Sequence, residues 1–142
     1  MASDHAPVDA GRMAARPPSL LLATTLTLIV ALGASVFGAF FLAIAAGLVP
    51  FLGSANALGP AGVLGAVTIG YGVLAVVAAA GLWTHRAWAW PLATTIHLVA
   101  FVGVLIALET GGTGSHILAG LALTGGGLAA LVPPSTREAL WR

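Results

Sequence analysis

The sequence has no cysteine and no lysine, and charged residues make up only 6% of its 142 positions. Without cysteine, these residues cannot form disulfides, thiolate metal sites or iron–sulfur clusters. The net charge is +1 and the arginines are scattered, so there is no basic stripe that could neutralise a phosphate backbone, which argues against a nucleic-acid partner. Because soluble domains carry about 25% charged residues, the scarcity of charge also argues against an ordinary water-soluble domain.

Apolar residues are correspondingly abundant, at 59% of the chain with a mean hydropathy of +1.06. A chain this short has too little interior to hide so much apolar surface, so lipid is the expected solvent. We predict an all-α, antiparallel, up-down four-helix transmembrane bundle. The expected spans are 19–49, 61–83, 88–108 and 115–132, between a flexible tail at 1–18 and a C-terminal tail at 133–142, where Pro133 and Pro134 end the last span.

The first expected span is longer than a membrane requires. Thirty residues of helix reach about 45 Å, whereas the hydrocarbon core is about 30 Å thick. Residues 47–58 therefore either lie in the outer interface or extend the first helix. The apolar run is also too long for the hydrophobic region of a cleaved signal peptide, so we expect it to be retained.

The arginines predict the orientation of the chain. In this topology all five fall on one side, which the positive-inside rule assigns to the cytoplasm together with both termini. The tryptophans lie at the same face, where indoles anchor to lipid headgroups. The residues are Arg12, Arg16, Arg86, Arg137 and Arg142, with Trp83, Trp88, Trp90 and Trp141. The richness in Ala, Gly, Leu and Val, with Arg in place of Lys, suggests a high-GC bacterial genome and hence a bacterial inner membrane.

An internal repeat accompanies this topology. Residues 22–33 (LATTLTLIVALG) align with residues 92–103 (LATTIHLVAFVG) at an offset of 70, with six of the twelve positions identical. A duplicated helical hairpin would produce this pattern, with the two halves related by an axis along the membrane normal. Chance similarity between low-complexity apolar segments is the alternative.

Small residues recur every fourth position on three expected spans. This spacing places them on one helix face and lets helices approach closely in lipid. Such faces serve either packing within the bundle or contact with a second copy or a larger membrane complex. The residues are Ala31, Ser35, Ala39, Ala43 and Gly47, then Gly62, Ala66 and Gly70, then Ala122, Gly126 and Ala130.

Three polar residues are candidates for function. His97 is expected near mid-membrane, where an ionisable group is costly, although a neutral imidazole can also be structural if it bonds Thr94, Thr95 or a neighbouring helix. Glu109 and His116 flank a Gly-rich loop and could pair, share a cation or simply face water. They are too few for a zinc site, and the expected depth difference of about 15 Å argues against one haem joining His97 and His116.

We predict a non-enzymatic accessory or interaction protein without a cofactor. No nucleophile with its base and orienting group is recognisable, and the glycine patterns lack phosphate-loop context. A small transporter or channel using His97 is the first alternative, and a haem- or quinone-binding subunit of a redox complex is the second. The expected partners are the bilayer and a homo-oligomer or larger membrane complex.

The segment Gly81–Trp90 (GLWTHRAWAW) resembles the junction between helices two and three of small four-helix bacterial membrane proteins of unknown function, and is loosely similar to DoxX-like proteins. In that group, a Gly-Leu-rich helix end leads through a short turn to an Arg-x-Trp-Ala start. The resemblance covers about ten residues and the four-span layout. It implies a four-helix bundle and no catalytic residue.

Overall fold

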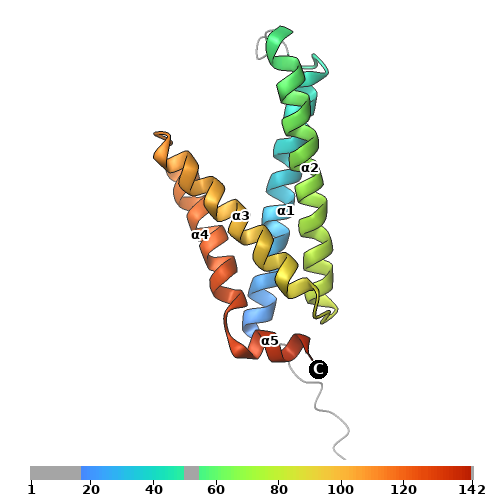
Figure 1. Ribbon diagram of the computed structural model, residues 1–142, viewed down its shortest axis with the longest axis vertical. Helices are drawn as coiled ribbons and strands as arrows, with labels where there is room; N and C mark the ends of the chain where they lie inside the picture. Colours follow the sequence, from blue (N-terminus) through green and yellow to red (C-terminus); the bar gives the residue numbers. More distant parts are fainter. Residues whose placement is uncertain (1–16, 50–54, 142) are drawn as a thin grey trace, which may run out of the picture.

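A computed structural model describes residues 17–49 and 55–141, and within these ranges the chain is helical with no strand. The helices are α1 (Pro18–Ala45), α2 (Ala55–Trp83), α3 (Ala89–Glu109), α4 (Ser115–Leu131) and α5 (Pro134–Leu140). Helices α1 and α2 form one antiparallel hairpin, and α3 and α4 form a second. The hairpins meet at the end that carries α5 and diverge toward the other end (Figure 1).

Three helical segments are long and apolar enough to cross a membrane: Pro18–Ala45, Gly59–Trp83 and Ala89–Glu109. The pair formed by α4 and α5 also meets these criteria when taken together, but it bends by 67° at its break. The described chain is therefore compatible with a multi-pass membrane protein of three or four spans. Many large apolar side chains face outward, as expected where lipid is the solvent.

The helix ends differ from the sequence prediction in three places. Helix α1 stops at Ala45, α2 begins at Ala55 and contains Pro60, and residues 134–140 of the expected tail form α5. Pro133 and Pro134 do end α4, but Pro134 is also the first residue of α5, a position at which the missing amide hydrogen costs nothing. The prediction for residues 50–54 lies outside the described residues.

Three helices end in the same hydrogen-bonded turn, in which a residue with positive φ follows the helix. Gly47 ends α1, His85 ends α2 and Gly111 ends α3, with φ of 71°, 56° and 88°. In each case the next amide bonds a carbonyl five residues back, as in Arg86 N–H to Gly81 O at 2.8 Å, which is the Schellman arrangement. His85 is unusual because a side chain other than glycine occupies the left-handed conformation.

The two hairpins pack by different means. Between α1 and α2 small residues face small residues: a Cβ added at Gly65 would lie 2.9 Å from Gly38 O. Between α3 and α4, larger side chains of α3 fill space left by glycines of α4, as where a Cβ on Gly120 would lie 2.9 Å from Val104 Cγ2. Close backbone approach of this kind supports helix association where lipid supplies no hydrophobic drive.

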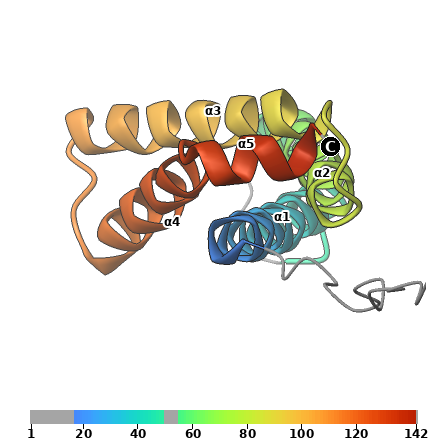
Figure 2. The ribbon, with the colours of Figure 1, turned by 90° about the horizontal axis from the view of Figure 1, so that it is seen from below.

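Helix α5 closes the end at which the hairpins meet. It runs across the ends of the longer helices rather than along them (Figure 2). Thr136 Oγ1 donates to Ala130 O at 3.0 Å and lies within hydrogen-bond distance of the Ser19 hydroxyl at 2.7 Å, so a single buried hydroxyl contacts both α1 and α4. Trp90 Nε1 donates to Leu131 O at 2.9 Å, which satisfies a carbonyl at the end of α4.

Candidate functional site at a buried histidine

His97 lies on α3 and is completely buried, with 0% of its surface exposed. Its Nε2 atom is 3.1 Å from Thr27 Oγ1 on α1. Thr27 is itself 0% exposed and bonds the carbonyl of Ala23 at 2.7 Å. The histidine therefore joins the second hairpin to the first through a side chain contact in the interior.

The hydroxyl of Thr27 determines how the imidazole is bonded. A hydroxyl has one hydrogen, and the shorter contact, to Ala23 O, takes it. Thr27 Oγ1 then accepts from Nε2–H of His97, and in the neutral ring Nδ1 is left with a lone pair. Nδ1 is buried and has no hydrogen-bond partner among the described residues. An unsatisfied buried acceptor of this kind costs about 1–3 kcal/mol, so the position is a costly one.

Gly127 of α4 leaves the space that the imidazole occupies. A Cβ built on Gly127 would overlap Cε1 and Nδ1 of His97 and lie 2.6 Å from Nε2. The neighbouring Gly126 is different, since a Cβ there would make an ordinary 3.5 Å contact with Leu26 of α1. The run of three glycines in α4 therefore has a packing role at its third position, where no side chain fits beside the ring.

Helix α2 contributes Tyr71 at the same level of the structure. Its hydroxyl donates to Ile96 O at 2.6 Å, one residue before His97. Thr27, Tyr71, His97 and Gly127 thus bring together one residue from each of α1, α2, α3 and α4. The buried histidine stands where the two hairpins cross.

This arrangement limits the chemistry that His97 can perform in the observed conformation. An iron or zinc ligand needs one ring nitrogen with an open approach, but Thr27 contacts Nε2 and the backbone of Gly127 lies against the Nδ1 side. The described residues also contain no group of three or more His, Cys, Asp or Glu able to hold a metal ion. In the observed conformation the ring therefore acts through its hydrogen bond to Thr27.

Thr94 and Thr95, which the sequence suggested as partners of His97, instead bond their own helix. Their hydroxyls donate to Trp90 O and Pro91 O at 2.8 and 2.9 Å. The partner that sequence reasoning missed is Thr27. A signal for it existed, since Thr27 and His97 are the equivalent positions of the two aligned segments, 70 residues apart.

Glu109 and His116 do not join His97. Glu109 is the last residue of α3 and His116 the second of α4, and both are exposed at the end where the hairpins diverge. Across the described ranges no ion pair links them. They are therefore exposed residues on either side of the loop and do not extend the buried site.

No protein-family model, curated protein or solved structure matches this chain. The residues themselves must therefore carry any functional argument.

The small residues expected on helix faces divide into two groups. One group packs inside the protein: Ala31 and Ala130 are buried, Ser35 approaches Gly72 of α2, and Gly126 contacts Leu26. The other group is on the surface and comprises Ala39, Ala66, Gly70 and Ala122, with Gly62 partly exposed. The buried face of α2 is formed by other residues: Ala61, Gly65, Gly72, Ala75, Ala78, Ala79, Gly81 and Leu82.

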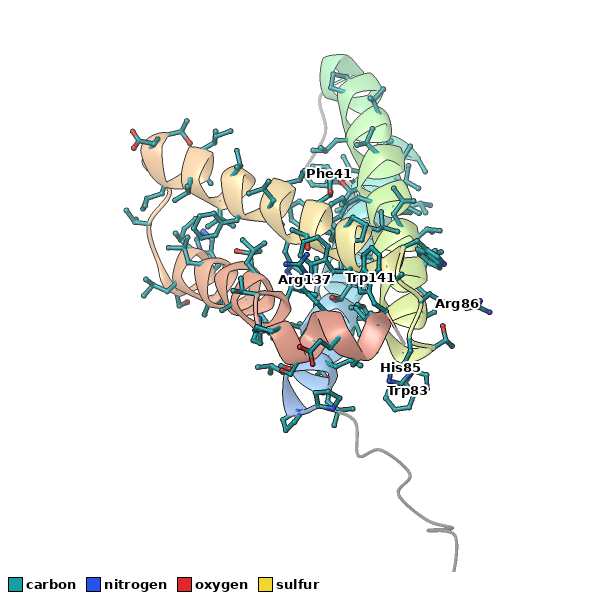
Figure 3. All side chains as sticks on the ribbon, turned by 60° about the horizontal axis from the view of Figure 1, so that its bottom comes forward. Phe41, Trp83, His85, Arg86, Arg137 and Trp141 are labelled. Atoms are coloured by element: carbon teal, nitrogen blue, oxygen red, sulfur yellow. The ribbon has the colours of Figure 1, made fainter. Side chains whose placement is uncertain are left out.

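The expected interface anchors gather at the end of the molecule that carries α5. Trp83, Arg86, Arg137 and Trp141 all lie there, on the turn after α2 and on α5 (Figure 3). Trp83, Trp88 and Trp141 expose 51%, 49% and 70% of their surface. Trp90 is half-buried instead, because its indole supports the guanidinium of Arg137, 5.1 Å from the ring centre.

Proposed function

We propose that this chain is a multi-pass protein of a bacterial inner membrane with four spans, of which α4 is the last, and that α5 follows it at the cytoplasmic face. Both termini lie on the cytoplasmic side, and the hairpins form a four-helix bundle that opens toward the outer side. The support is the position of Arg86 and Arg137 at one end of the molecule, with exposed indoles beside them. The likeness of Gly81–Trp90 to small four-helix bacterial membrane proteins agrees with this layout.

Within that membrane, the protein acts as a non-enzymatic accessory or interaction protein that packs a small-residue helix face against a second copy or a larger complex. One observation carries this proposal. Ala66 and Gly70 lie on the exposed surface of α2, with Gly62 partly exposed next to them, and a Cβ built on Gly70 would meet no atom within 4 Å. The inner face of α2 is already used against α1, so this outer stripe is free for another helix.

Transport through His97 has less support. A proton or ion path must bring water to the imidazole, whereas the ring is 0% exposed and lies between Thr27 of α1 and Gly127 of α4. The unpartnered Nδ1 is the one feature that favours it.

The test is substitution of Gly70 by leucine. Because nothing lies near Gly70, the added side chain leaves the monomer fold intact but blocks close approach of a partner helix. Gly103 on α3 provides a matched control, since it is also an exposed mid-helix glycine with no atom within 4 Å of an added Cβ. We expect Gly70→Leu to reduce assembly in native membranes about tenfold or more, and Gly103→Leu to leave it unchanged, as measured by chemical crosslinking and native mass spectrometry. Equal assembly of both variants would count against an interaction surface on α2.

A further inference from the structure

A hollow of about 400 Å³ lies beside the bend between α4 and α5. Its walls are Val132, Pro134, Arg137, Glu138 and Trp141. The 67° bend creates this space, because α5 turns away from the axis of α4 and carries its side chains across the end of the molecule. The hollow is separate from the buried histidine.

Arg137 supplies a fixed positive charge in one wall. Its guanidinium stacks over the indole of Trp90 at 5.1 Å, and this indole is in turn held by its bond to Leu131 O. In the described part of the chain Arg137 makes no ion pair with a carboxylate, including that of the adjacent Glu138. The cation is therefore held in place by an aromatic ring while its hydrogen-bond donors remain available to an anion.

The other walls are largely apolar. Val132 and Trp141 expose 73% and 70% of their surface, and Pro134 is also exposed. An occupant must therefore carry an anionic group next to apolar matter. A free phosphate would satisfy Arg137 but would gain nothing from the indole and the valine, whereas a phospholipid satisfies both.

We propose that this hollow binds an anionic phospholipid, with the phosphate on Arg137 and the glycerol and upper acyl region against Val132 and Trp141. The inference rests on the proposed membrane orientation, which puts α5 at the depth of the cytoplasmic headgroups. Arginine suits this role because its planar fork matches phosphate oxygens. Glu138 lines the same hollow, and its negative charge repels the anion. Removing this charge should therefore strengthen the binding of an anionic lipid, whereas removing the charge of Arg137 should weaken it.

The experiment uses the full chain in nanodiscs of equal phosphatidylglycerol and phosphatidylcholine, from which lipids retained after detergent release are counted by native mass spectrometry. Arg137→Gln removes the proposed anchor. Arg86→Gln is the matched control, because Arg86 is exposed at the same end but does not line the hollow. Because Arg137→Gln removes the charge-assisted contact to the phosphate, we expect it to lower the phosphatidylglycerol preference about fivefold, whereas Arg86→Gln removes no contact in the hollow and should preserve it.

Glu138→Gln is expected to raise the preference, a gain that a merely destabilised protein would not show. Equal retention by the Arg137 and Arg86 variants, or no gain in the Glu138 variant, would overturn the lipid site. Alkaline carbonate extraction keeps this failure distinct from failure of the membrane proposal. A chain that is extracted contradicts the membrane placement, whereas a retained chain with unselective lipid binding contradicts the site alone.

Discussion

Replacing Gly127 by alanine tests whether the histidine site controls the packing of the two hairpins. In an unobstructed helix position, Gly→Ala stabilises by up to about 1 kcal/mol. At Gly127 the new methyl would occupy the position of the His97 ring, with Nε2 only 2.6 Å away. The ring cannot retreat easily, because it is completely buried and its Nε2 lies 3.1 Å from Thr27 Oγ1. Overpacking of this kind costs about 1–3 kcal/mol, so we expect a net loss of unfolding free energy.

Three further variants isolate the contact: two single substitutions and one double variant. Gly126→Ala is the matched control on the same helix, because its methyl makes only a 3.5 Å contact with Leu26, and we expect between no change and a small gain. His97→Ala removes the ring that the new methyl would strike. In that background Gly127→Ala should cost little, so the double-mutant cycle should give a coupling of about 1–3 kcal/mol.

The unfolding free energy can be measured by titrating sodium dodecyl sulfate into mixed micelles and following helical circular dichroism. Each of the four proteins is compared with the unmodified chain under one lipid composition. If Gly127→Ala and Gly126→Ala behave alike, or if the loss persists undiminished without His97, then the imidazole does not fill the space beside Gly127 and the description of the site is wrong.

Two other substitutions test contacts elsewhere in the fold, one between α5 and the longer helices and one between α1 and α2. Thr136→Val keeps the side-chain volume but removes the buried hydroxyl that contacts Ser19 and Ala130 O. We expect the unfolding free energy to fall by about 1–2 kcal/mol and α5 to become sensitive to limited proteolysis. Unchanged protease resistance would contradict the described contacts. Gly65→Ala places a methyl 2.9 Å from Gly38 O and should lower the melting temperature in detergent, so a raised melting temperature would show that α1 and α2 are not so closely packed.

The helical content and most helix ends follow directly from the sequence. Apolar runs of membrane length predict the helices, and α3 and α4 begin and end within one residue of the expected positions. The sequence does not predict helix α5, because a pair of prolines indicates the end of a helix. A proline ends the helix before it and equally suits the first turn of the next, and the pattern alone does not distinguish these roles.

The candidate site was predicted only in part. His97 is recognisable in the sequence as an ionisable group within an apolar run, but its surroundings depend on how the two hairpins cross. Gly127 looks like a low-complexity glycine until the ring is seen against it, and Thr27 looks like an ordinary helix threonine. The side chains that define the site come from helices distant in sequence, so helix periodicity could not reveal them.

The contact between Ser19 and Thr136 has a consequence for the order in which the protein is made. These residues are 117 positions apart, at the first turn of α1 and within α5. Ribosomal synthesis produces α1 before the other helices and α5 after α4. Until α5 has been made, the two hairpins can associate only through contacts between their own helices, because the hydroxyl of Thr136 is not yet present.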